Sequence, residues 1–182
     1  MMRSLELDPN FLLEPCDFDV AEHFVWKHHR TAKNLNKQSH LMSYLASYRT
    51  SVLGVVSLSR PCGRWGKEWG RVVEISRICF TPALTRKKFY TAPSLIVQMA
   101  CNGFLAEDFY SGDQSRWGKV QNFVTYIHDT ESGLYLEYAG FEKAGEVSHS
   151  PNSKGWNSRE GRAESDLSDK IRYMRHVGCH YE

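Results

Sequence analysis

The chain has 182 residues, with 23 Lys and Arg against 21 Asp and Glu, and a formal net charge of +2. Hydrophobic residues make up 41% of the chain and aromatic residues 13%, which excludes disorder throughout and supplies enough apolar surface for one domain with a core. The sequence lacks both a run of roughly 18 to 20 apolar residues and a signal peptide, so we expect a soluble, cytoplasmic protein with no membrane partner.

Charge is distributed unevenly along the chain. Residues 1–24 carry a net charge of −5, residues 25–90 carry +11, and residues 91–182 carry −4. A basic block of this size favours an anionic partner, either nucleic acid or a donor that carries phosphate. The five cysteines include no C-x-x-C pair, which predicts reduced thiols and neither a disulfide framework nor a structural zinc site.

The first predicted element is an amphipathic helix that begins near Asp19. Asp19 and Glu22 have the spacing of a capping box, and Val20, Phe24 and His28 follow at intervals of four residues. This spacing places His28 on the buried face. The polar residues 27–34 predict the end of the helix and a loop.

Three strands are predicted next, over residues 40–48, 52–58 and 71–80. The first two are joined by a short polar turn, which indicates a hairpin, and a Gly-rich loop over 60–70 precedes the third. Strict alternation in the third strand places Glu74 and Arg77 on opposite faces. A strand with two charged residues among apolar neighbours indicates that it ends at a functional site.

A basic loop and a helix follow the third strand. Arg86, Lys87 and Lys88 are consecutive, Thr91 has the position of an N-cap, and Leu95, Ile96, Met99 and Ala100 are apolar. Unpaired N–H groups at a helix start, with basic residues beside them, form a site for phosphate. The alternative is a basic loop that is simply solvated.

The remaining predicted elements are a strand over 120–128, a short helix over 131–139 that ends at Gly140, and a strand over 141–149. Residues 150–182 are polar, with one helix near 167–176. This order predicts an α/β (α+β) fold with an antiparallel front and a crossover helix. We expect one domain over 1–149 and a polar C-terminal extension over 150–182, which is either part of that domain or a flexible tail.

The element order and residues 71–80, 86–94, 120–128 and 133–141 together resemble the GNAT superfamily of acyl-CoA-dependent N-acyltransferases. The resemblance implies a mixed, mostly antiparallel sheet flanked by helices, and acetyl-CoA or another acyl donor as cofactor. It implies donor contacts from Ile78, Phe80, Arg86, Lys87, Lys88, Thr91 and Ser94. Two departures stand out: residues 86–92 contain no glycine of the usual pyrophosphate loop, and Leu136 replaces the tyrosine that often protonates the leaving thiolate.

Shorter motifs are similar to those of phage Mom-type DNA-modification proteins and their prokaryotic relatives. These motifs are His28-His29-Arg30, the segment from Glu74 to Arg77, and Thr125-Tyr126 followed by residues 133–141. The likeness implies carbamoylmethylation of the N6 amine of adenine in phage DNA, which protects that DNA from restriction. It also raises iron as a possible metal.

The reaction needs an uncharged amine, hence a base, and donors that stabilise the developing oxyanion. Glu74 is a candidate base, and its alternative role is a structural charge. The candidate catalytic residues are Glu74, Ser76, Arg77, Tyr126, His128, Asp129 and Tyr135. A second group, His28, His29, His128 and Asp129, has the residue types of an acid–base pair or a metal site, although no spacing forms a ligand motif.

Basic residues alternate with tryptophans in several loops, a pattern that suits phosphate contact and base stacking. The candidate nucleic-acid contacts are His28, His29, Arg30, Arg60, Arg64, Trp65, Lys67, Trp69, Arg116 and Trp117. Each Trp has the alternative role of covering an apolar patch. Two further functions remain open: an acetyl-CoA-dependent N-acetyltransferase of a small amine or a protein, and a non-catalytic nucleic-acid-binding protein.

Overall fold

The computed structural model describes residues 10–29, 34–61, 67, 71–84, 91–110, 120–147 and 169–178. The elements in chain order are β1 (Phe11–Cys16), α1 (Phe18–His28), β2 (His40–Tyr48), β3 (Ser51–Ser59), β4 (Val72–Phe80), α2 (Ala92–Tyr110), β5 (Asn122–His128), α4 (Leu134–Tyr138), β6 (Glu142–Val147) and β7 (Lys170–His176). Among the described residues, no helix is long and apolar enough to cross a membrane.

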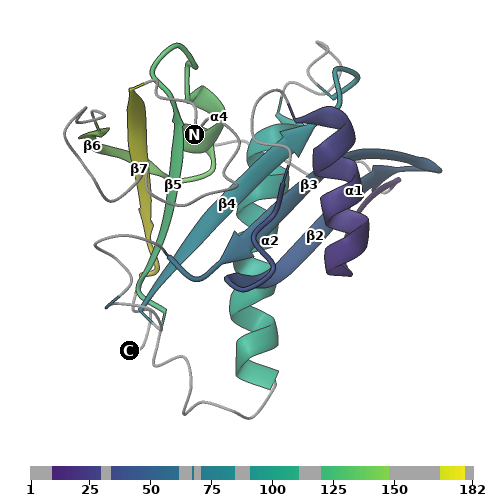
Figure 1. The fold of residues 1–182 in the computed structure, drawn as a ribbon, viewed down its shortest axis with the longest axis horizontal. Coiled ribbons are helices and arrows are strands. Elements are labelled where there is room, and N and C mark those ends of the chain that lie inside the picture. The colour runs from purple at the N-terminus through teal and green to yellow at the C-terminus, as the bar shows by residue number, and fades with distance from the viewer. Residues whose placement is uncertain are drawn as a thin grey trace, which may run out of the picture.

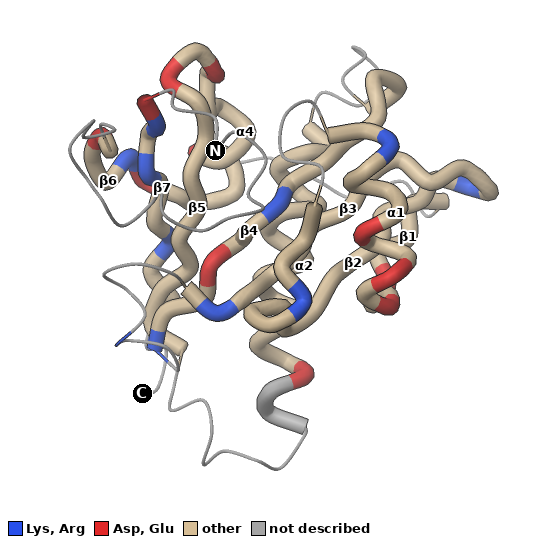
Figure 2. The backbone as a smooth tube through the Cα atoms, viewed as in Figure 1, with Lys and Arg blue, Asp and Glu red and all other residues tan. Residues whose placement is uncertain are grey.

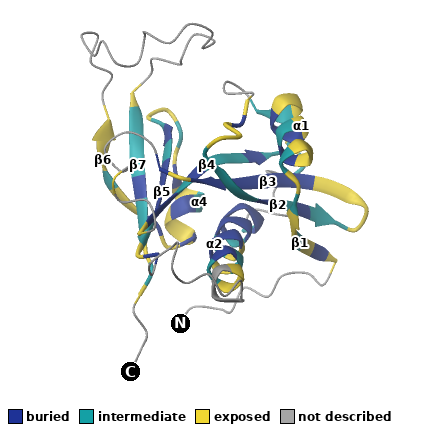
Figure 3. Ribbon diagram, turned by 60° about the horizontal axis from the view of Figure 1, so that its bottom comes forward, coloured by how far each residue is buried: buried dark blue, intermediate teal, exposed yellow. Residues whose placement is uncertain are grey.

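The strands form one seven-stranded sheet in the order β1-β2-β3-β4-β5-β7-β6. Every neighbouring pair is antiparallel except β4 and β5, which are parallel and are connected through α2. Helix α1 lies on one face of the sheet, and α2 and α4 lie on the other (Figures 1 and 3). This architecture confirms the predicted mixed, mostly antiparallel sheet with flanking helices.

Two apolar clusters hold the helices against the sheet. The larger cluster packs Ile96 and Phe104 of α2 against Leu58 of β3 and Phe123 of β5. The smaller cluster packs α1 against β3 and β4, and Val25 and Val55 are fully buried in it. Full burial of one such side chain contributes roughly 1.5 to 3 kcal/mol, so the two helices are fixed on their faces mainly by apolar contact.

The hairpin was predicted closely, because alternating apolar residues and a short polar turn specify it locally. Strand β2 has the predicted bounds, and β3 extends one residue further at each end. The turn residue Arg49 adopts a positive φ of 55°. Gly140 also ends α4 as predicted: its φ is 84°, and the Phe141 N–H donates to the carbonyl of Leu136 at 3.0 Å.

The buried faces of both long helices differ from the prediction. Helix α1 begins at Phe18 after the N-cap Asp17, so Asp19 and Glu22 do not form the predicted capping box. Its buried residues are Ala21, Phe24 and Val25, whereas Val20 is 46% exposed and His28 is only partly buried. Met99 of α2 likewise points outward. Each helix has apolar residues on more than one face, and the way it packs against the sheet decides which of these residues are buried.

Strands β1 and β7 were absent from the prediction, and the helix predicted near 167–176 is wrong. Lys170–His176 is a strand that inserts between β5 and β6, paired with β5 along its whole length. Its apolar residues Ile171 and Tyr173 face the larger core cluster. Pairing with a strand about 50 residues earlier stabilises β7, and no local pattern in its basic sequence signals that partner.

A β-bulge in β4 changes the faces of its residues. Leu58 of β3 lies opposite Ile75 and the preceding residue Ser57 lies opposite Arg77, so Ser76 is an extra residue in β4. Directly opposed residues point to the same face, and therefore Glu74 and Arg77 both point to the α1 face. The predicted strict alternation, which placed them on opposite faces, is wrong for this reason.

Candidate active site

The parallel strands β4 and β5 pair over only three residues each and then separate. Strands β4 and β5 pair over Val72 to Glu74 with Asn122 to Val124. The Thr125 hydroxyl then donates to the Ile75 carbonyl at 3.0 Å. Beyond this bond the strands diverge toward their carboxyl ends (Figure 1). The second half of β4 therefore has an edge that β5 does not occupy.

Helix α2 begins at the end of β4 where the strands have diverged. Thr91 is in the N-cap position, since its carbonyl accepts from the Leu95 N–H at 3.2 Å and from the Ser94 hydroxyl at 2.9 Å. N–H groups of a first helical turn have no intrahelical acceptor and attract anions. The basic triplet Arg86, Lys87 and Lys88, predicted to join them, lies outside the described residues.

Helix α4 places one tyrosine at the end of β4. The Tyr135 ring meets the Phe80 ring edge-on with centroids 6.3 Å apart, whereas Leu136 is buried in the core and Tyr138 is 78% exposed. Gly133 precedes the helix with a φ of 65° and lies against the Tyr173 hydroxyl. Tyr135 is thus the α4 tyrosine that contacts the carboxyl end of β4. Ile78, the other predicted donor contact on β4, is partly buried against the same core.

Glu74, Ser76 and Arg77 lie together at the bulge. Ser76 donates from its hydroxyl to the Ser57 carbonyl at 3.3 Å, and Arg77 donates to the Ser76 carbonyl and, at 3.0 Å, to the Asn34 carbonyl. Arg77 therefore ties the bulge to the segment that follows α1. Glu74 is partly buried on the same face, one row of the sheet away.

Residues that the sequence analysis did not identify continue this polar face onto β3 and β2. The Ser43 and Ser57 hydroxyls are 2.8 Å apart and fully buried, and the His40 Nε2 lies 2.9 Å from Ser43 Oγ. Burial lowers the pKa of the His40 imidazole. In the sequence, Ser57 and Ser59 occupy alternating positions among apolar residues, and this pattern could have predicted a polar row on one face of the sheet.

The predicted residues Tyr126, His128 and Asp129 lie at the carboxyl end of β5 and directly after it. Tyr126 and His128 alternate with buried neighbours and are partly buried, and Asp129 is exposed, with its N–H donating to the Asp169 carbonyl at 3.2 Å. In the antiparallel register, Tyr126 is opposite Arg172 of β7. Arg172 is therefore a basic neighbour of the candidate site. The sequence analysis did not identify it, because it predicted a helix over this segment.

His28 and His29 do not join the β5 residues in a metal site. The His28 ring packs on Phe24 with centroids 4.5 Å apart, and its pKa is lowered by burial and by the nearby Lys27 and His23. His29 is the C-cap of α1. Within the described part of the chain, no group of three or more His, Cys, Asp or Glu side chains could hold a metal. The described residues therefore do not fit an iron site.

Cysteine is also a poor candidate nucleophile in the described ranges. Burial raises the pKa of the Cys79 thiol to about 11, and burial together with Asp17 raises that of Cys16 to about 11. A thiol with such a pKa is protonated at neutral pH. These two positions do not supply the thiolate that a covalent acyl-enzyme would need.

Of the predicted nucleic-acid contacts, the structure describes His28, His29, Arg60 and Lys67. Arg60 is exposed after β3, and its N–H donates to the Ser39 carbonyl at 2.7 Å, while Lys67 is exposed. Arg30, Arg64, Trp65, Trp69, Arg116 and Trp117 lie outside the described residues. In Figure 2 the described basic residues are spread over several strands, with acidic residues on α1.

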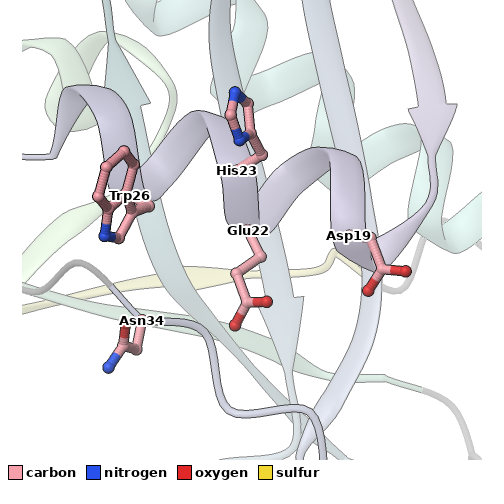
Figure 4. Close-up of a pocket in the computed structure, with 5 residues that line it drawn as sticks. All are labelled: Asp19, Glu22, His23, Trp26 and Asn34. Carbon is pink, nitrogen blue, oxygen red and sulfur yellow. The ribbon is translucent and has the colours of Figure 1, made fainter.

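A cleft of about 370 Å³ lies beside α1, lined by Asp19, Glu22, His23, Trp26 and Asn34 (Figure 4). The Asn34 side chain lies across from the helix, whose acidic side chains line the other part of the cleft. The other lining residues are on the side of α1 opposite its buried face, and the Asn34 carbonyl, which accepts the bond from Arg77, connects the cleft to the polar face of the sheet. Two carboxylates and an exposed Trp suit a cationic group better than a phosphate.

No protein-family model matches the chain, and no curated protein matches it in sequence. Solved structures do match. The IAA acetyltransferase of Bacillus cereus ATCC 14579 has a TM-score of 0.60 at 12% identity, covering 92% of this chain and 99% of that one. A Bacillus subtilis acetyltransferase in complex with CoA has a TM-score of 0.57 at 13% identity, covering 93% and 99%. A GNAT-family acetyltransferase of Streptococcus pneumoniae has a TM-score of 0.56 at 11% identity, covering 92% of this chain and 99% of that one. The chain therefore has the fold of the GNAT acetyltransferases.

Proposed function

We propose that this protein is an N-acyltransferase that uses an acyl-CoA donor. The observation that carries the proposal is the divergence of β4 and β5 beyond Ile75, together with the start of α2 near the carboxyl end of β4 (Figure 1). No described strand pairs with β4 on this side beyond Ile75, so a chain-like ligand can pair with that edge, and the helix start attracts its phosphates. One of the similar structures, the Bacillus subtilis acetyltransferase, is in complex with CoA.

In this proposal the donor extends from the α2 N-terminus along the edge of β4 that β5 does not occupy. Thr91 and Ser94 lie at its phosphate end, with Arg86, Lys87 and Lys88 preceding them in the chain. Ile78 and Phe80 lie along its middle. The thioester then reaches the bulge at Ser76, where the strands come together.

The acceptor amine attacks the thioester from the α1 face. Its nitrogen forms a bond to the acyl carbon, the C–S bond breaks, and one proton leaves the nitrogen while one joins the thiolate. Glu74 is the proposed base for the first proton. Tyr135 is the proposed donor of the second; it packs on Phe80, beside the middle of the donor, so its hydroxyl would have to extend along β4 toward Ser76 to reach the sulfur. Arg77 holds the bulge in place through the Ser76 carbonyl.

The finer proposal is that the acceptor is the N6 amine of adenine in DNA, the amine that Mom-type proteins modify. The acyl transfer described above would give an N6-acyl adenine, whereas a Mom-type carbamoylmethyl group is joined to N6 through a CH2 carbon and would need a bond to that carbon instead. DNA as the acceptor is supported by the charge of +11 over residues 25–90 and by the Trp-Arg segments of the loops. Replacing Arg64 and Lys67 by Ala should weaken DNA binding and reduce the slope of its salt dependence. Binding and slope both equal to those of the unaltered protein would count against DNA.

A second candidate acceptor is a small cationic amine or a protein amine. The cleft beside α1 favours it, because Asp19 and Glu22 attract a cation and repel phosphate. The Asn34 carbonyl connects the cleft to the face from which an acceptor would approach Glu74. In this case the acceptor would lose a proton before its attack, so Glu74 would matter more than for adenine.

Two measurements test the proposal. Acetyl-CoA should raise the melting temperature by mass action, and no shift at millimolar donor would leave a non-catalytic nucleic-acid-binding protein as the explanation. Mass spectrometry should then detect the acylated product among nucleosides of cellular DNA or among amine acceptors in vitro. Glu74→Gln should abolish the product while the donor still binds, and Glu146→Gln on the exposed strand β6 serves as the matched control.

A further inference from the structure

The α1 face of the sheet carries two adjacent polar rows that cross β2, β3 and β4. The first row is His40, Ser59 and Glu74, and the second is Ser43, Ser57 and Arg77. The next row, Leu45, Val55 and Cys79, is apolar and lies under α1. The polar rows therefore lie beside the apolar contact of α1 with the sheet, and Phe18 at the start of α1 reaches the first row at His40.

His40 is held in a fixed orientation at one end of these rows. Its Nε2 lies 2.9 Å from Ser43 Oγ, which lies 2.8 Å from Ser57 Oγ. The Phe18 ring meets the imidazole edge-on with centroids 5.0 Å apart. When Nε2–H donates into this pair of hydroxyls, Nδ1 is the nitrogen that remains to accept a proton.

Ser59 lies between His40 and Glu74 in the first row, directly opposite each of them in the sheet. It is 4% exposed. Two strand spacings amount to about 10 Å, so His40 and Glu74 are too far apart for a direct hydrogen bond. A serine hydroxyl both donates and accepts, and therefore has the chemistry to connect them.

We propose that His40 is a positioning residue that receives, through the Ser59 hydroxyl, the proton that Glu74 removes from the acceptor amine. This inference rests on the proposed acyltransferase function and extends it from one base to a row of three residues. The amine proton passes to the Glu74 carboxylate, Glu74 returns to its charged form by giving a proton to Ser59, and Ser59 gives its own proton to His40 Nδ1. The resulting imidazolium loses that proton to solvent, so no group is consumed.

The environment of His40 suits a temporary proton acceptor. Burial lowers the pKa of His40, so the imidazole is neutral at physiological pH and accepts a proton only briefly. The titratable and charged groups on the elements around it are Glu14 and Cys16 on the same face of β1, Asp17 beside Phe18, Lys37 over the Phe18 ring, Arg60 after Ser59, and Glu74 and Arg77 on β4. Glu74 is the only acid in the first row.

A double-mutant cycle on the transfer rate tests the connection. His40→Gln and Ser59→Ala should each lower kcat by about 10- to 100-fold with little change in KM for the donor. The double variant should be no slower than the slower single variant, because both changes interrupt one path. Ser47→Ala, on the same strand as His40 but outside both rows, is the control. Independent, multiplicative losses in the double variant would overturn the inference.

The pH profile of kcat adds a readout that a purely structural role would not change. In the unaltered enzyme kcat should fall at low pH as the His40 imidazole becomes protonated. In His40→Gln this fall should move to lower pH, because glutamine does not titrate. A fall at the same pH in both proteins would overturn the inference even where kcat is reduced.

A measurement that needs no activity separates this inference from the proposed function. NMR titration of the imidazole, assigned with His40→Gln, should show that Glu74→Gln lowers the His40 pKa by a few tenths of a unit, roughly as one lost charge near 10 Å implies. Glu146→Gln should leave it unchanged. An equal pKa in the unaltered protein and Glu74→Gln would overturn the connection. If the pKa moves but no amine is ever acylated, the proposed function fails and the coupling of the two residues stands.

Discussion

The Thr125 hydroxyl donates a hydrogen bond of 3.0 Å to the Ile75 carbonyl at the place where β4 and β5 cease to pair. Thr125 is 2% exposed, and Ile75 immediately precedes the extra residue of the β4 bulge. The bond joins the two strands next to the proposed thioester site. It therefore fixes where the divergence of the two strands begins.

Replacing Thr125 by Val should lower the free energy of unfolding by about 1 kcal/mol, because Val keeps the shape but removes the donor to Ile75. Chemical denaturation measures the change. Thr125→Ser is the matched variant: it keeps the hydroxyl and loses one methyl group. If donor binding weakens in Thr125→Val but not in Thr125→Ser, the bond positions the site. Equal effects of both variants would assign Thr125 a packing role only.

Tyr44→Phe should leave stability unchanged or raise it by up to about 1 kcal/mol. The Tyr44 hydroxyl is buried beneath α2 and finds no hydrogen-bond partner within the described part of the chain. Burial, with a smaller effect of Glu107 and Cys101, raises the pKa of this phenol. Removing an unpaired buried hydroxyl removes its desolvation cost. A clear loss of stability on thermal unfolding would show that the hydroxyl has a partner in solution.

Gly133→Ala should destabilise the protein by about 2 kcal/mol or more. The residue has a φ of 65°, and a Cβ there would clash with the Tyr173 hydroxyl oxygen. Tyr173 also donates to the Glu137 carboxylate at 3.3 Å, so its ring is held in place. Tyr173→Phe in the Gly133→Ala background should recover part of the loss. A Gly133→Ala protein with unaltered stability would contradict the geometry at the start of α4.

Stability should fall as the pH decreases from about 7 to 5, through the ordinary histidine range. Burial lowers the folded-state pKa of His40 and of His28, so the unfolded chain binds protons at a higher pH than the folded one. The loss begins near the unfolded pKa of about 6.5 and ends below the folded value. His40→Gln should flatten this slope of the unfolding free energy against pH, and a slope equal to that of the unaltered protein would show that His40 does not contribute.

The sequence determined the elements whose signals are local. The hairpin of β2 and β3, the start of α2 after Thr91 and the end of α4 at Gly140 each depend on a few neighbouring residues: alternation, an N-cap and a left-handed glycine. The predicted order of strand, basic loop and helix depends on the same local signals. The mixed, mostly antiparallel sheet followed from that order together with the resemblance.

Only the tertiary structure decided the parts that depend on distant pairing. Strand β7 is stable because β5 and β6 pair with it on both sides, and its own sequence favours no partner. The bulge at Ser76 depends on how β3 pairs with β4. Because Ser76 is an extra residue in β4, Glu74 and Arg77 point to the same face. The approach of His40, Ser59 and Glu74 is likewise a matter of register between three strands. The residue pattern within one strand does not specify the register of the neighbouring strands, so the polar face could be identified only from the tertiary structure.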